Sequence, residues 1–273
     1  MANPRVSVIM ATWNRGHLIG RGVQSVLDQT FADWELIIAG DGPPPETESA
    51  IRAWIEKDGR IRYVRCPHSG RIAAVSNAGL KAARGEYAAI LDDDDWWLDP
   101  EKLAKQAAFL DARPEYIACG GGFVFIDGGG REIGRELKPE TDGKIRRVAL
   151  FANPIVNSAG MFRRAAAGFY DETMPQFADW DFWLNLGRKG KLYNFPEYFL
   201  AYRMWEGGSS FTHQKENASA AFSIIRRHRN DYPGFSLAFL SATAYWLYAR
   251  LPLFIRRGAN SFLSRLKKRL FSR

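Results

Sequence analysis

The sequence predicts an α/β fold in which a mostly parallel sheet is flanked by helices. Over roughly the first hundred of the 273 residues, short apolar runs alternate with amphipathic helical patterns, as in βαβ units. Most of these apolar runs end at polar residues, and ligands of open α/β sheets bind outside the carboxyl ends of the strands. The length allows one large domain, or a domain with an appendage, around a substantial core.

Each element of the first half follows from its local pattern. Apolar runs predict strands, the amphipathic runs between them predict helices, and Arg84-Gly85 is typical of a helix end. The expected strands are 5–11, 34–39, 61–65 and 87–91, and the expected helices are about 17–29, 46–57 and 73–83.

The second half has a weaker pattern. A helix is expected at 100–112, strands at 116–126, 155–163 and 198–204, and a short helix from about 179 to 187. The glycines at 128–130 resemble a phosphate cradle, but they lie between two strand-like segments. A hairpin turn is therefore the better interpretation.

Four consecutive aspartates, Asp92 to Asp95, follow the apolar run 87–91. Crowded carboxylates repel one another, and a divalent metal or hydrogen-bond donors offset that repulsion. Mg²⁺ or Mn²⁺ fits best, because these ions take few carboxylate oxygens and complete their coordination with water and substrate phosphate. The run therefore indicates a phosphorylated or nucleotide ligand. The alternative is a solvated acidic turn that caps a helix near Asp99.

Charge and cysteine content exclude several classes of protein. Lysine and arginine number 38 against 30 acidic residues, and the residues from Gly234 onward contain eight cations and no acid. The rest of the chain is balanced, which argues against nucleic acid as the main partner. Cys66 and Cys119 lack metal-type spacing, so we expect reduced thiols in a cytosolic protein. The N-terminal residues lack the pattern of a secretory signal.

Five short motifs, in their order and spacing, resemble those of family 2 glycosyltransferases with the GT-A fold. They are 6–15 (VSVIMATWNR), 40–42 (GDG), 76–79 (SNAG), 89–96 (AILDDDDW) and 178–184 (ADWDFWL). The resemblance covers residues 5–215. It implies a Rossmann-like sheet, a hexosyltransferase type of activity, a nucleotide-diphosphate sugar donor with UDP as the first expectation, a divalent ion, and inversion at the anomeric carbon.

The resemblance carries donor-binding roles onto matching positions. Asp41 matches the aspartate that contacts the nucleobase, where a carboxylate can accept the ring N–H. The alternative is a tight-turn aspartate before Gly42. Thr12 and Trp13 are expected beside the base or ribose, although Trp13 could equally be a core aromatic. The set expected to bind the nucleotide sugar is Thr12, Trp13, Asn14, Asp41, Arg71, Asn77, Asp92 and Asp93.

The acidic run matches the family's D-x-D motif. This match makes Asp94 the expected ligand of Mn²⁺ or Mg²⁺, with Asp92 or Asp93 facing ribose hydroxyls. Carboxylates two residues apart on an extended segment point the same way. Asp95 is an alternative cap of the next helix. The tryptophans at 96 and 97 are expected to pack in the core rather than stack on a sugar.

Asp179 matches the catalytic base that deprotonates the acceptor hydroxyl. A partly desolvated carboxylate is basic enough for this role, and its rival role is a helix N-cap. Asp179 and Asp181 point in different directions on a helix, so only one can easily be the base. The candidates for the acceptor side, on position alone, are Asn157, Ser158, Trp180, Asp181 and Trp205.

Some positions depart from the family pattern. Relatives carry a histidine shortly after a Tyr-Arg pair, whereas residues 202–206 here read YRMWE. Whether His213 or Glu206 replaces that contact stays open. Arg71 stands where relatives often have glycine and Ser76 where they often have arginine. A guanidinium at Arg71 could still clamp the diphosphate.

The C-terminal region predicts a second property. Residues 235–255 are apolar but interrupted by Arg250 and Pro252, which makes a poor membrane span. Residues 262–271 alternate apolar and basic side chains at helical spacing, as in helices that lie on anionic membrane surfaces. We expect a peripheral protein on the cytoplasmic face that meets a lipid-linked acceptor in cell-envelope glycan synthesis. The alternative is a helix packed on the body with a solvated basic end.

The expected domains are a GT-A domain at 1–215, with a nucleotide-binding half at about 1–98 and an acceptor half at 99–215, and a helical extension at 216–273. A non-catalytic protein that binds a nucleotide sugar or a glycan is the main alternative, since fold does not fix function. A dinucleotide-dependent oxidoreductase is weaker, because no G-x-G-x-x-G follows the first strand. A nucleotidyltransferase would share the metal but attack phosphorus.

Overall fold

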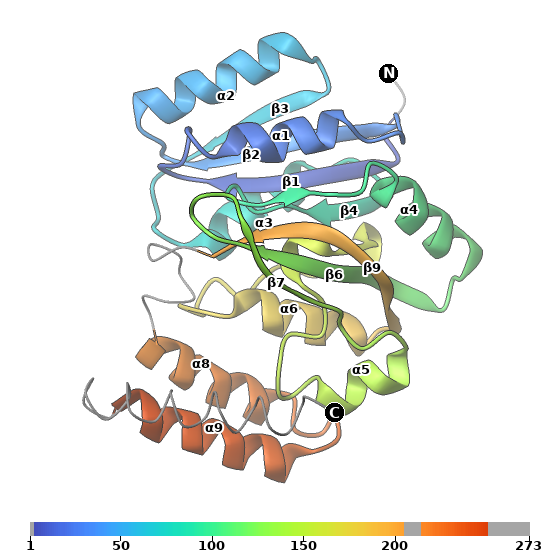
Figure 1. Ribbon diagram of the computed structural model, residues 1–273, viewed down its shortest axis with the longest axis vertical. Helices are drawn as coiled ribbons and strands as arrows, with labels where there is room; N and C mark the ends of the chain where they lie inside the picture. Colours follow the sequence, from blue (N-terminus) through green and yellow to red (C-terminus); the bar gives the residue numbers. More distant parts are fainter. Residues whose placement is uncertain (1–2, 205–213, 251–273) are drawn as a thin grey trace.

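The computed structural model describes residues 3–204 and 214–250. Within them an extended sheet runs through the molecule with helices on both faces, and two further helices lie at the end opposite α2 (Figure 1). The α/β fold class predicted from the sequence is therefore confirmed.

The first half follows the predicted alternation of strands and helices. Its elements are β1 (Val6–Thr12), α1 (Ile19–Leu27), β2 (Trp34–Asp41), α2 (Pro45–Lys57), β3 (Ile61–Cys66), α3 (Ile72–Ala82), β4 (Tyr87–Ile90), β5 (Trp96–Trp97) and α4 (Lys102–Ala112).

The second half is less regular. Its elements are β6 (Tyr116–Ile126), β7 (Glu132–Glu136), α5 (Asp142–Val148), the 3₁₀ helix η1 (Asn157–Ala159), β8 (Met161–Arg163), the 3₁₀ helix η2 (Arg164–Ala166), α6 (Ala178–Gly187), β9 (Lys191–Arg203), α8 (Gln214–Arg227) and α9 (Phe235–Arg250).

The strand order places a topological switch at β1. The sheet runs β3-β2-β1-β4-β8-β6-β9-β5, with β7 paired to β6. The strands β3, β2, β1 and β4 are parallel, β8 is antiparallel to its neighbours β4 and β6, and β6 and β9 are again parallel. Because β1 lies between β2 and β4, chain connections leave it on both sides, and a crevice opens there at the carboxyl ends of the strands.

The alternation of side chains along each strand divides the core into two layers. On β1, Val6, Val8 and Met10 pack with α1, α2 and α4 on one face, whereas Ile9 packs with α3 and α6 on the other. These strands are apolar on both faces, as expected for parallel strands covered by helices. A third cluster joins α6 to α8 and α9 through Trp180, Leu184, Ile224, Ile225 and Ala238, among others.

Several element boundaries differ from the prediction. The strand expected at 155–163 is a 3₁₀ turn followed by the three-residue β8, and the strand expected at 198–204 begins earlier, at Lys191. The helix expected from 100 begins at Lys102, and Asp95 does not cap it. Neither α5 nor β5 was predicted from the sequence. The glycines at 128–130 do form the β6–β7 hairpin turn.

Candidate active site

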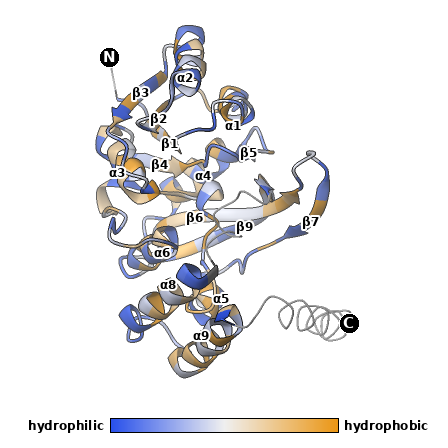
Figure 2. Cartoon of the chain, turned by 90° about the vertical axis from the view of Figure 1, so that its left-hand side faces the viewer, coloured by the Kyte–Doolittle hydropathy of each residue, from blue (hydrophilic) through white to orange (hydrophobic). Residues whose placement is uncertain are grey.

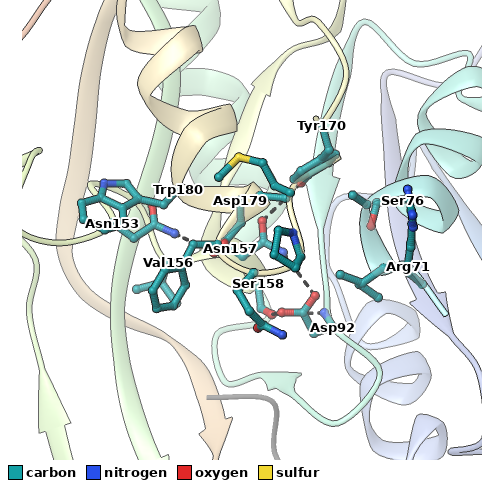
Figure 3. A pocket seen from close by; sticks show the side chains of 18 of the residues that line it. Arg71, Ser76, Asp92, Asn153, Val156, Asn157, Ser158, Tyr170, Asp179 and Trp180 are labelled. Carbon is teal, nitrogen blue, oxygen red and sulfur yellow. Dashed lines mark hydrogen bonds between the residues drawn. The ribbon is translucent and has the colours of Figure 1, made fainter. Parts of the chain in front are cut away.

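A cavity of about 1660 Å³ opens at the carboxyl ends of β1, β2 and β4. Its wall on one side comes from these strand ends, the segment 68–76 and the acidic loop. The opposite wall comes from residues 150–158, 170–180 and the helices α8 and α9. Figure 3 shows this region from close by, with Asp92, Asn157 and Asp179 gathered in one part of it.

The acidic loop is held from the second half of the chain. The carboxylate of Asp92 accepts hydrogen bonds from Ser158 Oγ at 2.9 Å and Asn157 Nδ2 at 3.2 Å. Asp95 Oδ1 accepts the backbone N–H of Arg203 at 3.0 Å. Ser158 and Asn157, predicted on the acceptor side, thus lie in the cavity and orient the loop that was predicted to bind donor and metal.

The loop concentrates negative charge in a region of low solvent access. Burial and the neighbouring charge of Asp94 raise the pKa of Asp92 to about 7, and burial raises the pKa of Asp93 to about 6. Burial also raises the pKa of Asp95 well above its usual value. One cation already lies here, because Arg15 Nη1 contacts Asp93 Oδ1 at 2.8 Å and Asp94 Oδ2 at 2.9 Å. The local charge favours binding of positive groups.

The donor set fits a hard divalent cation that is shared with a phosphorylated ligand. In the described parts of the chain, no three His, Cys, Asp or Glu side chains are grouped as a complete metal site. Mg²⁺ and Mn²⁺ do not need one, because they bind through one or two carboxylates and fill other positions with substrate phosphate and water. Asp94 and Asp92 both line the cavity and supply such carboxylates.

The predicted nucleobase contact, Asp41, is buried at the end of β2 and lines the cavity. Its carboxylate accepts hydrogen bonds from Ser69 N at 2.7 Å, Ser69 Oγ at 2.9 Å and Gly70 N at 2.9 Å. Asp41 therefore shapes the loop that leads into α3. This loop presents His68, whose ring stacks on Trp13 with centroids 5.0 Å apart. Trp13 is half exposed, so the core alternative for it is wrong.

The other donor-side residues divide into two groups. Thr12, Asn14 and Arg71 line the cavity. Arg71 Nη1 donates to the carbonyl of Glu172 at 3.1 Å, which ties the residue before α3 to the 170–172 segment. Asn77 is buried and is not part of the lining; its amide bonds the backbone of Tyr170 at both ends. Asn77 therefore joins α3 to the 170–172 segment.

Asp179 lies in the first turn of α6, where the positive end of the helix dipole points at it. Burial raises the pKa of its carboxyl group. Asn153 Nδ2 donates to Asp179 Oδ2 at 2.6 Å, and Asn153 Oδ1 is buried with no hydrogen-bond partner among the described residues. Phe177, two residues earlier, has φ of 59°, a conformation that costs a non-glycine residue about 1–2 kcal/mol. Strain of this kind gathers at functional sites.

The remaining acceptor-side predictions have different outcomes. Trp180 borders the cavity, but its indole N–H donates to the Ala149 carbonyl at 2.8 Å and the side chain is buried. Asp181 does not reach the cavity. Its carboxylate lies between α6 and α8, where His228 Nε2 and Arg227 Nη1 contact it at 2.9 and 3.0 Å. Trp205, Glu206 and His213 lie outside the described residues.

Two residues of this site were missed by the sequence analysis. Asn153 follows α5 in a loop with no recognisable motif, so no local signal marked it. Arg15 belongs to the quoted motif 6–15, but its contact with the acidic loop depends on β1 and β4 pairing side by side. That pairing brings together residues 78 positions apart.

Comparison with known proteins identifies the family. The family model described as Glycosyl transferase family 2 matches residues 7–168, which is more than half of the chain. The chain belongs to glycosyl transferase family 2. It is thus a glycosyltransferase, and the resemblance seen in its sequence motifs is confirmed.

Individual relatives agree with this family. The chain is 27% identical over 269 residues to an uncharacterized glycosyltransferase of Methanocaldococcus jannaschii, covering 93% of this chain and 92% of that protein. It is 34% identical over 105 residues to the Escherichia coli enzyme named UDP-Glc:alpha-D-GlcNAc-diphosphoundecaprenol beta-1,3-glucosyltransferase WfgD. That match covers 38% of this chain and 40% of the relative.

The structure has the GT-A fold. The mannosyltransferase PcManGT from Pyrobaculum calidifontis, solved in complex with GDP-Man and Mn²⁺, superimposes with a TM-score of 0.67 at 17% identity. The match covers 97% of this chain and 81% of that one. At this identity the likeness concerns the fold.

Proposed function

We propose that this family 2 glycosyltransferase is an inverting enzyme that moves a sugar from a nucleotide-diphosphate donor to a hydroxyl of a glycan or lipid-linked acceptor. The observation that carries the proposal is the position of Asp179. A carboxyl group with a raised pKa lies at a helix N-terminus in the same cavity as the acidic loop. A base and a charged donor site on one cavity are what sugar transfer with inversion requires.

The donor is assigned to the wall formed by β1, β2 and the acidic loop. Exposed Trp13 offers an aromatic face for a base, and Thr12, Asn14 and Asp41 line the space around it. The relative WfgD is named for UDP-Glc, so we propose a UDP-linked donor first. Asp92 or Asp93 would face the ribose, as the family motif implies.

Asp94, with Asp92, would hold Mn²⁺ or Mg²⁺, which when bound supplies positive charge against the diphosphate. The solved mannosyltransferase of this fold contains Mn²⁺, which supports the assignment. Arg71 reaches the same cavity and would offset the charge that grows on the leaving nucleoside diphosphate.

Asp179 would accept the proton of the acceptor hydroxyl while that oxygen attacks the anomeric carbon from the face opposite the diphosphate. The new C–O bond forms as the bond to the phosphate oxygen breaks, and no covalent enzyme intermediate is needed. Asn153 donates to Oδ2 of Asp179 and so orients the carboxylate that would receive the proton.

The acceptor is assigned to the wall formed by residues 150–158, α6, α8 and α9. WfgD is named for an acceptor sugar on diphosphoundecaprenol, and an Escherichia coli relative 26% identical over 256 residues is named a putative colanic acid biosynthesis glycosyl transferase. These names support a role in cell-envelope polysaccharide synthesis, which we place at the cytoplasmic face of a membrane. Among the described helices, none is long and apolar enough to cross a bilayer.

A screen of nucleotide sugars tests the donor. Each would be tested for a rise in melting temperature with and without Mn²⁺, because a ligand that binds only the native state raises apparent stability. Release of nucleoside diphosphate would then be measured for Asp179→Asn, Asp94→Asn and the exposed control Asp28→Asn.

We expect Asp179→Asn to keep the donor-induced rise but to lose about 10²- to 10⁴-fold in turnover. Asp94→Asn should lose the Mn²⁺-dependent part of donor binding, and the control should behave as wild type. Donor binding with no turnover on any acceptor would instead identify a non-catalytic binding protein.

A further inference from the structure

The helix α9 carries an apolar stripe on its outward side. Leu237, Leu240, Ala244 and Leu247 follow one another at intervals of three, four and three residues, which places them on one face of the helix. All four are exposed, the three leucines by 64%, 64% and 55%. No charged residue occurs in α9 before Arg250. An exposed apolar stripe of this kind marks a binding surface.

The opposite face of α9 is already occupied. Ala238, Ala242 and Ala249 are buried against the rest of the protein, and Phe239 and Trp246 make edge contacts with Phe222 of α8. The short alanine side chains let α9 lie close to α8. The leucine stripe is therefore the side of α9 that packing within the described chain leaves uncovered.

The charged residues of the C-terminal sequence segment that contains α9 all have one sign. From Gly234 to the C-terminus the sequence has eight lysine and arginine residues and no aspartate or glutamate. An apolar helix face in a segment with only positive charge matches the interface of a membrane with anionic lipids, where leucines enter the acyl boundary and cations meet phosphates. A second copy of the chain fits less well, because two such segments would repel each other.

We propose that the leucine stripe of α9 (Leu237, Leu240, Ala244 and Leu247) docks on the surface of an anionic lipid bilayer. Both views of the molecule place α8 and α9 at the end opposite α2, so this end would face the bilayer (Figures 1 and 2). The helix lies on the membrane rather than through it, since one face is committed to α8.

Docking through α9 would also place the reaction cavity beside the membrane. Ala238, Ser241, Ala242 and Tyr245 of α9 belong to the wall of the cavity that contains Asp179. An acceptor sugar on a lipid diphosphate could then enter the cavity with its lipid still in the bilayer. This step rests on the proposed function, whereas the docking itself does not.

Vesicle sedimentation of the full-length protein tests the docking. Phosphatidylcholine vesicles with and without phosphatidylglycerol would be compared for wild type, L237S/L240S/L247S and L237E/L240E/L247E. The control L98E/I133E/F169E makes the same charge change at three exposed apolar residues outside α8 and α9. Melting temperature and donor-induced stabilisation, measured without vesicles, show that each variant is folded.

We expect wild type and the control to bind anionic vesicles. Both α9 variants should bind at least about tenfold more weakly, because three leucines no longer leave water. The proposal is overturned if the α9 variants bind anionic vesicles as tightly as the control does. It is also overturned if the wild type does not bind them. A wild-type dimer that the serine variant converts to a monomer would also overturn it, by assigning the stripe to a second copy. None of these readouts requires sugar transfer, so loss of the proposed function would leave the test valid.

Discussion

At the residue scale, the cavity is built from carboxylates whose environments differ. Asp179 has one carboxylate oxygen held by Asn153, whereas both oxygens of Asp41 are bonded by the 69–70 loop. Burial raises the pKa of Asp179, and hydrogen bonds from the backbone N–H groups of Trp180 and Asp179 and from Asn153 oppose that rise. The raised pKa of a buried carboxyl group that lines the cavity supports Asp179 as the group that accepts a proton.

The contact between Asn153 and Asp179 leads to a prediction about pH. The amide hydrogen bond stabilises the charged carboxylate and lowers the pKa of Asp179, against burial, which raises it. In Asn153→Ala the pKa should rise further. Because the base acts in its ionised form, activity is lost as pH falls through this pKa, so the acid limb of the rate profile should move to higher pH.

The measurement is the pH dependence of kcat for release of nucleoside diphosphate. We also expect kcat at the optimum to fall about 10- to 100-fold, because the base loses its fixed orientation. Asn185→Ala is the matched control, since Asn185 makes the same kind of bond to Asp181 on the same helix, at 2.9 Å. An unchanged acid limb in Asn153→Ala would remove Asp179 from the role of base.

The sequence predicted which strand ends carry the site, but it did not predict which contacts each side chain makes. The motifs at 12–15, 41 and 92–95 meet at one edge because the sheet order β2-β1-β4 brings their strands together. The partner of each side chain depends on contacts between distant segments, such as Asn157 with Asp92. For the same reason Asn77 and Asp181, which are plausible from their motifs, are committed to structural contacts.

At the element scale, the helices are positioned by close contact with the sheet. Gly79 of α3 lies against β1, where an added Cβ would come within 2.6 Å of Ile9 Cγ2. Gly143 of α5 has open space around the same position. Both glycines are helical, so intrinsic helix preference favours alanine at each by up to about 1 kcal/mol.

The two glycines should therefore respond to alanine in opposite directions. We expect Gly143→Ala to raise the free energy of unfolding by up to about 1 kcal/mol. Gly79→Ala should lower it by about 1–3 kcal/mol, because Ile9 must move or α3 must shift away from the sheet. Urea unfolding monitored by circular dichroism measures both. Equal stabilisation by the two substitutions would show that α3 packs more loosely on β1 than the structure indicates.

The contact between α6 and α8 is a second feature that positions a helix. Asp181 is buried, and it accepts from Arg227 and contacts buried His228. In Asp181→Ala the buried His228 loses the acceptor of its Nε2 and Arg227 loses one of its two carboxylate partners, and we expect the free energy of unfolding to fall by about 3 kcal/mol. Asp171→Ala removes a more exposed partner of Arg227 and should cost less than about 1 kcal/mol. If urea unfolding showed similar losses of the free energy of unfolding in the two variants, Asp181 would not be the main residue that joins α6 to α8.

In the helix pair α8–α9, the sequence pattern did not predict which face of α9 is packed and which is exposed. The apolar composition of 235–255 indicated either an interrupted span or a packed helix. The described part is one continuous helix, Phe235–Arg250, whose buried alanines, Ala238, Ala242 and Ala249, face inward and whose leucines face outward with Ala244. Hydrophobicity alone could not separate these faces, since both are apolar. The predicted basic helix at 262–271 lies outside the described residues.

At the scale of the whole molecule, the predicted domain boundary near residue 215 stays a prediction. It concerns function rather than folding, because the apolar core extends across this position. Ile224 and Ile225 of α8 share one buried cluster with Trp180 and Leu184 of α6 and with Leu150. The helix α6 in turn packs on the sheet through Phe182 and Trp183. The apolar core is thus continuous from β1 to α9 through α6. This helix also carries the proposed base, Asp179.

A continuous core predicts a single cooperative unfolding transition for the full chain. Tryptophan fluorescence and far-ultraviolet circular dichroism should give the same midpoint, since separate folding units would melt separately. A chain that ends before α8, residues 1–213, would expose the α6 side of the cluster and leave Asp181 without Arg227 and His228. We expect this fragment to lose cooperative unfolding and nucleotide binding together, although Trp13, Asp41 and the acidic loop are all present in it. Two separate transitions in the full chain, or a fragment that binds donor as tightly as the whole, would mean that α8 and α9 are an appendage that the active site does not need.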